Sequence, residues 1–191
     1  EVNASQNDKD FIAAINWKKI EEYVAQGVGT MEPARYAHNV WDDHTHTATT
    51  TMEKEVLIIN PEDVPGAIYF LPTPKSPHGC DVDPTGEYII GSGKLAATIT
   101  VHSFSKMLKA IEDKAFDGET YSIPIINYEA VNYGSLEQPG LGPLHTEFDT
   151  RGNGYTTFFI SSEVVKWNIK DLVVIDRKPT FYSVGHLMIP G

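Results

Sequence analysis

Three of the seven histidines in this sequence stand in similar surroundings and could together bind a metal ion. His78, His145 and His186 each follow a lead-in that contains Pro or Gly, in KSPHG, LGPLH and SVGHL. Imidazole is the commonest side-chain ligand for metals such as copper and zinc, and a site needs several ligands that converge from different parts of the fold. A histidine repeated at one place in successive structural units meets that need. The competing interpretation is a signature histidine that hydrogen-bonds a backbone group inside its own unit, and the spacing leaves both open.

The other four histidines give weaker signals. His44 and His46 form a His-x-His pair in DDHTHTATTT, which places both on one face if the segment is a strand. The segment is polar and flanked by acidic residues, so a solvated strand or loop is the favoured interpretation, and His38 lies in similar surroundings. His102 falls near the end of the run TITVHSF, which favours a structural role.

The elements that would position the three histidines recur with a regular period. A turn that contains Asn or Ser and opens an amphipathic segment occurs four times, at Asn16, Asn60, Ser103 and Asn168, with spacings of 44, 43 and 65 residues. The first two spacings match the period of roughly 40–45 residues of a four-stranded propeller blade. The Gly/Pro/Asn-rich segment 127–143 is the predicted insertion that lengthens the third. Once it is allowed for, the three histidines lie in phase with these turns.

Short strands follow the turns. EYIIGSG, AATITVHSF, YTTFFIS and EVVKWN are rich in β-branched and aromatic residues, whereas only KKIEEYVAQG and KMLKAIEDKAFDG have the apolar spacing of short helices. We therefore predict an all-β fold, a β-propeller with short peripheral helices. About four repeats of roughly 43 residues fit, fewer than a closed ring of blades usually has. We accordingly expect residues 1–191 to form a single, partial propeller domain of a longer chain.

The composition argues against several classes of function. The chain has 15 Lys and Arg against 26 Asp and Glu, a formal net charge of −11, and so is unlike proteins with the basic face that nucleic acids and anionic lipids require. The single cysteine, Cys80, cannot form an intramolecular disulfide or supply a two-cysteine metal site. No apolar run approaches the roughly 18 residues of a membrane span. The sequence therefore predicts neither nucleic acid binding nor a membrane span.

Two long stretches of the sequence resemble signature stretches of a known enzyme family. Residues 70–101 (FLPTPKSPHGCDVDPTGEYIIGSGKLAATITV) and 140–169 (GLGPLHTEFDTRGNGYTTFFISSEVVKWNI) resemble the β-propeller domain of nitrous oxide reductase. The segment DKDFIAAINWKKIEEYVAQG is similar to the preceding blade of that family, so the resemblance covers most of the chain. The stretch from Glu32 to Met52 and the insertion near Tyr133 are not matched to segments of the family.

This resemblance implies a seven-bladed β-propeller with a sulfide-bridged cluster of four coppers, CuZ, at which nitrous oxide is reduced to dinitrogen and water. Seven histidines bind the cluster in the family, and His78, His145 and His186 match three of them. Lys166 of VVKWN matches a lysine close to the cluster that could donate a proton or steady a hydroxide. A lysine that faces solvent from a strand is the competing interpretation.

Further groups follow from the same resemblance. A structural calcium ion is expected at Glu1 and Asp10, with Ser76 in the place of a family asparagine. The other copper ligands and the cupredoxin domain with its dinuclear CuA site lie outside this chain, so the chain alone is expected to be inactive. The full protein is expected to be a periplasmic homodimer that receives electrons from a c-type cytochrome or a cupredoxin.

Copper-binding imidazoles also need partners for their second ring nitrogen. Each should donate that N–H to a carboxylate or a carbonyl, which fixes the tautomer and the orientation of the ring. Three carboxylates are close enough in sequence to be considered: Asp81, Asp83 and Asp149.

The residues alone are compatible with two other functions. One is a non-catalytic β-propeller that serves as a binding scaffold, with structural blade histidines and no stoichiometric copper. The other is a mononuclear metal hydrolase that uses the three histidines and a water molecule on zinc or manganese. No HExxH or similar local pair supports the hydrolase.

Overall fold

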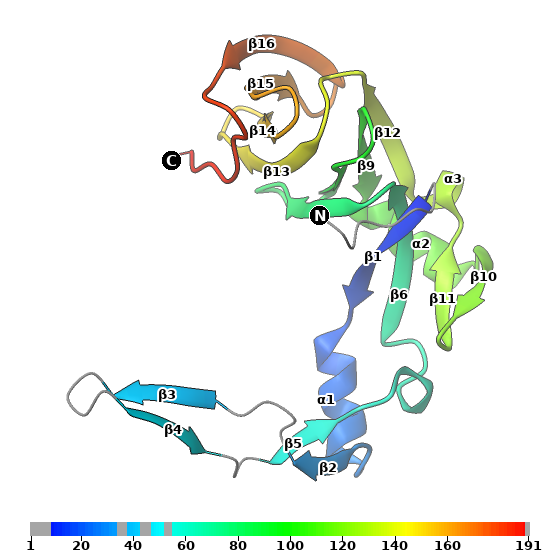
Figure 1. Cartoon of the computed structure of the whole chain (residues 1–191). Helices are drawn as coiled ribbons and strands as arrows, with labels where there is room; N and C mark the ends of the chain where they lie inside the picture. Colours follow the sequence, from blue (N-terminus) through cyan, green and yellow to red (C-terminus); the bar gives the residue numbers. More distant parts are fainter. Residues whose placement is uncertain (1–8, 34–37, 43–46, 52–54, 190–191) are drawn as a thin grey trace. The chain divides into compact units, whose positions relative to one another are not determined.

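The computed structural model describes residues 9–33, 38–42, 47–51 and 55–189. In this part the chain is mostly β, with short strands in several sheets and a few short helices (Figure 1), which confirms the predicted composition of elements. The contacts divide the chain into two compact units. The larger comprises Glu1–Ala14, Tyr69–Thr120 and Pro124–Gly191, and the smaller comprises Ile15–Ile68 and Tyr121–Ile123.

Two four-stranded antiparallel sheets form most of the larger unit (Figure 1). The first has the order β12-β9-β8-β7, with β7 (Pro77–Val82), β8 (Tyr88–Gly93), β9 (Thr98–Ser103) and β12 (Asn132–Glu137). The second keeps the chain order, with β13 (Pro143–Phe148), β14 (Asn153–Phe158), β15 (Glu163–Asn168) and β16 (Val173–Pro179). In both sheets, therefore, the strand that comes first in the chain lies at one edge.

A third four-stranded sheet, most of it in the larger unit, has the order β1-β6-β11-β10. Its strands are β1 (Lys9–Ile15), β6 (Ile68–Pro74), β10 (Phe116–Thr120) and β11 (Ile123–Ile126), and β11 runs parallel to β6. Two helices accompany it in the chain, α2 (Phe104–Glu112) and α3 (Tyr128–Val131). Met107 and Ala110 of α2 pack with residues of β1, β6 and β11 in one buried cluster.

The smaller unit consists of short elements. Helix α1 (Trp17–Ala25) precedes β2 (Thr30–Pro33), which pairs antiparallel with β5 (Glu55–Ile58). Strands β3 (His38–Asp42) and β4 (Thr47–Thr51) form a hairpin, and a single 3-10 turn, η1, covers Pro61–Asp63. None of the helices in the described ranges is long and apolar enough to cross a membrane.

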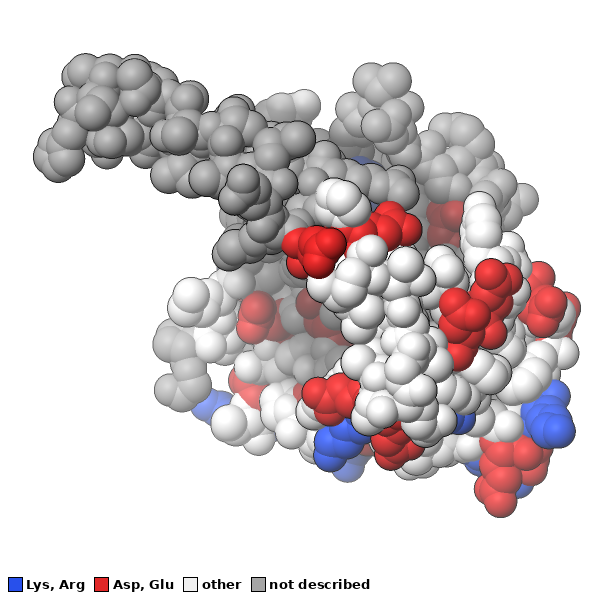
Figure 2. All heavy atoms as spheres, turned by 90° about the horizontal axis from the view of Figure 1, so that it is seen from below, with Lys and Arg blue, Asp and Glu red and all other residues white. Residues whose placement is uncertain are grey.

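The charged side chains of the surface are mostly acidic on the face shown in Figure 2. Asp and Glu outnumber Lys and Arg there, in keeping with the net charge of −11. The basic side chains seen there are scattered among the acidic ones.

Three of the four repeated turns contain the same side-chain-to-backbone hydrogen bond. Asn16, Ser103 and Asn168 each accept a hydrogen bond from the backbone N–H three residues later, at 3.1, 3.1 and 2.9 Å. At Asn16 and Ser103 the bond caps α1 and α2, because it satisfies an N–H that the first turn of a helix leaves unpaired. At Asn168 it closes the turn between β15 and β16. Asn60 also precedes a helical turn but makes no side-chain cap bond. A further cap, Asn127 before α3, was not part of the predicted repeat.

The predicted insertion at 127–143 is wrong in its position. The chain leaves the first antiparallel sheet after β9, passes through α2, β10, β11 and α3, and returns as β12. The inserted segment is therefore 104–131, and NYGSLE is an edge strand paired with β9, with a register shift between Asn132 and Gly134. Its Gly and Asn made this strand resemble a loop, but pairing with β9 outweighs that weak local preference.

Residues of both antiparallel sheets share one core. Ile90 of β8, Phe158 of β14 and Trp167 of β15 are fully buried in it. Trp167 donates its indole N–H to the Thr156 hydroxyl at 2.9 Å, so its polar end is satisfied inside the core. This core holds the two sheets against each other and fixes the positions of their edge strands.

His102 is a buried residue of β9, as its apolar neighbours predicted. Its Nε2 lies 2.9 Å from the carbonyl oxygen of Pro72 in β6, and its ring meets that of Tyr128 edge-on at 5.9 Å. A carbonyl only accepts hydrogen bonds, so Nε2 carries the proton. Burial lowers the pKa of His102 from 6.5 to about 4, which the bond to Pro72 opposes. The ring is therefore neutral at pH 7 and ties the first antiparallel sheet to the third.

This burial makes the stability of the fold depend on pH. The pKa of His102 is about 4 in the folded protein, so between pH 6.5 and 4 the unfolded chain binds more protons than the folded one. The stabilisation is complete above pH 6.5 and falls by about 3 kcal/mol as the pH is lowered to 4. His102→Gln keeps an N–H donor for Pro72 and does not titrate. In urea denaturation from pH 7 to 4, we expect the protein to lose more stability than the variant; parallel curves would contradict this.

Candidate metal centre

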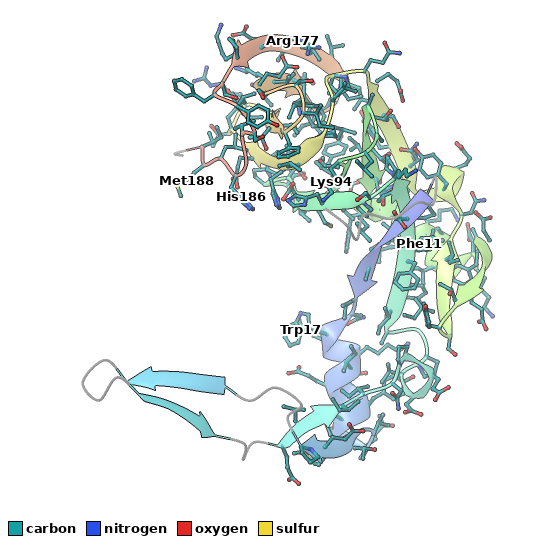
Figure 3. The ribbon with its side chains drawn as sticks, viewed as in Figure 1. Phe11, Trp17, Lys94, Arg177, His186 and Met188 are labelled. Atoms are coloured by element: carbon teal, nitrogen blue, oxygen red, sulfur yellow. The ribbon has the colours of Figure 1, made fainter. Side chains whose placement is uncertain are left out.

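The three histidines of the sequence motifs come together in the larger unit. His78 lies in β7 and His145 in β13. His186 lies in the segment that follows β16 (Figure 3). The ring centroids are 4.4 Å apart for His145 and His186, 5.1 Å for His78 and His145, and 6.5 Å for His78 and His186. His78 and His186 are exposed and His145 is half-buried. Imidazoles from three separate segments thus form one cluster.

His78 and His145 both stand where an edge strand is irregular. The register of β7 against β8 shifts between Pro77 and Gly79, and that of β13 against β14 shifts between Pro143 and Thr146. A bulge adds a residue that does not follow the pairing of its neighbours and so changes the direction of its side chain. The two histidines therefore occupy corresponding irregularities at the start of two sheets.

Gly79 allows β7 and β13 to approach each other closely. A Cβ atom at this position would lie 2.0 Å from the carbonyl oxygen of Leu144 and 2.8 Å from Oδ2 of Asp81. Contacts under 3.0 Å do not occur for real Cβ atoms, and a backbone oxygen cannot rotate away. Only glycine fits here, one residue after His78.

Asp81 joins the same two strands through its carboxylate. Oδ2 accepts the backbone N–H of Thr146 at 2.8 Å, and Oδ1 lies 3.3 Å from Nδ1 of His145. Both side chains of this pair are mostly shielded, with 20% of Asp81 and 26% of His145 exposed. Of the three carboxylates proposed to orient the imidazoles, Asp81 is found beside a histidine, His145.

The other two aspartates, Asp83 and Asp149, stabilise the turns that follow them. Asp83 accepts the N–H groups of Thr85 and Tyr88 at 3.2 and 2.8 Å. Asp149 accepts bonds from the backbone of Arg151 and from the backbone and side chain of Asn153. Burial acts to raise the pKa of Asp149, but these bonds together with one from Tyr155 lower it to about 2. Each carboxylate therefore serves its own hairpin.

Lys166 lies at the middle of the second antiparallel sheet. It pairs with Tyr155 of β14 on one side and with Asp176 of β16 on the other, and its Nζ is 5.3 Å from the centre of the Tyr155 ring. Its side chain is half-buried.

The residues expected to bind calcium are only partly described. Asp10 accepts the backbone N–H of Ser76 at 2.9 Å, and Ser76 has a positive φ of 57°. Glu1 lies outside the described residues, as do His44 and His46, and the side chain of His38 is not described either. Asp10 thus lies beside the residue that takes the place of the family asparagine.

The donor atoms fit copper chemically, because neutral imidazoles are good ligands for it. Nδ1 of His145 faces a carboxylate, as ligand histidines commonly do. Among the residues that the structure describes, however, no group of three or more His, Cys, Asp or Glu is arranged to hold a metal ion. The His145 and His186 rings are stacked, with centroids 4.4 Å apart and an angle of 27° between the ring planes.

Substitution of Gly79 tests how strongly the site depends on the approach of the two strands. Gly79→Ala forces β7 away from β13, and we expect it to lower the free energy of unfolding by about 3 kcal/mol in urea denaturation, as overpacking does. The matched control is Gly185→Ala, beside His186, where a Cβ meets nothing within 4 Å. This control should stay within about 0.5 kcal/mol of the unchanged protein. Equal stability of the two variants would show that the strands are free to separate.

Sequence comparison connects the site to known proteins. No protein-family model matches the chain. A nitrous-oxide reductase of Stutzerimonas stutzeri is 41% identical over 128 residues, which cover 62% of this chain and 18% of that protein. A nitrous-oxide reductase of Ralstonia nicotianae is 38% identical over 129 residues, with the same coverage, and one of Pseudomonas fluorescens is 36% identical over 104 residues, 54% of this chain and 15% of that protein.

A solved structure is similar only weakly. The match to a crystal structure of a Bacteroides uniformis protein covers 92% of this chain and 41% of that protein's chain, with a TM-score of 0.36 and 16% sequence identity. This similarity is too low to define the fold. The chain spans about a fifth of the length of the curated relatives that it matches. Over more than half of its residues this chain is related in sequence to part of nitrous-oxide reductase, and the resemblance that its motifs predicted is confirmed.

Proposed function

We propose that this chain is part of the catalytic domain of a nitrous-oxide reductase, which reduces nitrous oxide by two electrons to dinitrogen and water at a histidine-bound copper–sulfide cluster. The observation that carries the proposal is the meeting of His78, His145 and His186. Their motifs match copper-ligand positions of the family, and their rings lie within 4.4–6.5 Å of one another although the residues are far apart in the chain.

We further propose that the antiparallel sheets are blades of a partial β-propeller in a single domain of residues 1–191. In a propeller the innermost strand of each four-stranded blade lines the central channel, so innermost strands of neighbouring blades are close together. Strands β7 and β13 are the edge strands of two such sheets, they lie against each other, and each carries a histidine. This placement supports an axial metal site.

The residues have distinct parts in this proposal. His78, His145 and His186 would hold copper as neutral imidazoles, which add no charge that opposes reduction of the metal. When bound, the cluster would supply the electrons and hold the substrate. Lys166, a half-buried ammonium, would donate a proton to the oxygen that leaves as water or steady a hydroxide.

Other parts of the proposal rest on the resemblance. Asp10 together with Glu1 would hold a structural calcium ion, and the carboxylate of Asp10 beside Ser76 supports that position. The full protein would be a periplasmic homodimer, with CuA on a cupredoxin domain outside this chain and a c-type cytochrome or a cupredoxin as electron donor. Without those parts the chain alone would be inactive.

A non-catalytic scaffold remains the second candidate. It is favoured by the finding that no three metal-binding side chains among the described residues are arranged around one ion. Copper content separates the two functions, because a scaffold with structural histidines binds no copper in proportion to the protein.

Copper analysis of the full-length protein, expressed with its maturation machinery, tests the proposed ligands. We expect about four coppers more per chain than in a variant with His78, His145 and His186 all changed to Ala, together with loss of the sulfide-to-copper absorption band. His102→Gln is the matched control, because it also replaces a histidine, but a buried one that is hydrogen-bonded to the Pro72 carbonyl and is not a proposed ligand. This variant should keep the copper. Equal copper in the protein and the triple variant would leave the scaffold as the better explanation.

Kinetics of Lys166 variants test the proposed proton donor. General acid catalysis contributes on the order of 100-fold or more, so Lys166→Met should lower kcat by about that factor while copper content and absorption stay unchanged. Lys166→Arg keeps the positive charge but hardly releases a proton. A low kcat in both variants indicates proton donation, and recovery in the Arg variant indicates stabilisation of a hydroxide by charge. Full activity of Lys166→Met would remove Lys166 from the mechanism.

A further inference from the structure

One carboxylate serves two strands at the candidate metal centre. Oδ2 of Asp81, in β7, accepts the backbone N–H of Thr146 in β13 at 2.8 Å, while Oδ1 faces Nδ1 of His145 at 3.3 Å. The two oxygens of a single group thus reach consecutive residues of the neighbouring edge strand. Gly79 leaves the space for this, since a Cβ there would lie 2.8 Å from Oδ2.

The contact determines which nitrogen of His145 carries the proton. An ionised carboxylate accepts hydrogen bonds and donates none, so the neutral His145 ring places its proton on Nδ1. Nε2 then keeps its lone pair, the form in which an imidazole can bind a metal ion. The second bond, to the Thr146 backbone, fixes the position of the carboxylate relative to the strand that carries the histidine.

That strand is itself anchored in the core. The Thr146 hydroxyl is hydrogen-bonded to the Thr156 hydroxyl at 2.7 Å, and Thr156 accepts the indole N–H of Trp167 at 2.9 Å. Thr156 and Trp167 are fully buried. Asp81 is therefore bound to a rigid part of β13 and can orient the imidazole beside it.

We propose that Asp81 is a positioning residue that fixes the tautomer and direction of His145 for metal binding and at the same time holds β7 against β13. This inference rests on the proposed function in its first part only, because the contact between the strands exists in the protein without metal. The two roles predict different results for Asn and Ala at this position.

Asp81→Asn separates the roles. Its carbonyl oxygen can still accept the Thr146 N–H, but its amide NH2 replaces the oxygen that faced His145 and cannot accept a bond from Nδ1. In the full-length protein we expect the chelator concentration that removes half of the cluster copper to fall about 10- to 100-fold, the effect typical of a lost partner of a ligand histidine. The melting temperature of the copper-free protein should change little.

Asp81→Ala removes both bonds. It should lose copper as readily as the Asn variant and should also lower the melting temperature of the copper-free protein by several degrees. The matched control is Asp83→Asn, which removes a carboxylate charge two residues away from Asp81. The Asp83 carboxylate accepts hydrogen bonds from Thr85 and Tyr88 in its own turn. This control should keep the copper of the unchanged protein.

Three results would overturn the inference or part of it. Unchanged copper retention in Asp81→Asn rejects the positioning role, and equal melting temperatures of the Ala variant and the unchanged protein reject the strand contact. Equal loss of copper and of melting temperature in the Asn and Ala variants leaves Asp81 a structural role alone. If the unchanged protein holds no cluster copper, the proposed function fails, and the melting temperatures still decide the strand contact.

Discussion

Strands β7 and β13 approach each other at Gly79 so closely that a single methyl group would collide with the Leu144 carbonyl, 2.0 Å away. Much of the larger unit depends on this approach. It allows the edge strands of two sheets to lie side by side, and it brings His78 within 5.1 Å of His145 between ring centroids. The buried cluster shared by both sheets stabilises the same arrangement, because it packs Ile90 of one sheet with Phe158 of the other.

Polar groups in this region are divided between local and long-range contacts. Asp83 and Asp149 follow the two histidine-bearing strands, and each accepts hydrogen bonds from the turn it opens. Asp81 is only two residues from Asp83 but bonds across to another strand. Residues that are two apart on one strand would share a face, because successive residues alternate between the faces. Strand β7 ends at Val82, however, so Asp81 lies in the strand and Asp83 lies in the turn that follows it. The same side chain type thus stabilises a hairpin or a contact between sheets according to its place.

The sequence allowed good prediction where the signal was local. The mostly β composition, the two short helices α1 and α2, and the turns at Asn16, Ser103 and Asn168 follow from nearby residues and are found in the structure. The insertion was misplaced because the pairing of 132–137 with β9 is a long-range contact that composition does not encode.

The site shows the same division. The motifs identified the three histidines, which the structure brings together, whereas the functions of Gly79 and Asp81 could not be separated from those of neighbouring residues. Gly79 matters because of a carbonyl 65 residues later in the chain, and Asp81 because of a histidine 64 residues later. Only the fold places those partners beside them. Repeats reveal which positions correspond, but they do not reveal which strands meet.

The register shifts at His78 and His145 have a consequence for how such a chain can change over time. A shift between Pro77 and Gly79 means that the number of residues between the lead-in and the regular part of β7 is fixed. Loss or gain of one residue there would turn every later side chain of the strand to the opposite face, and Asp81 would point away from β13. Replacement of one residue by another leaves that count intact. Apart from positions such as Gly79 and Asp81, whose contacts require the residue present, this segment can vary by substitution but not in length.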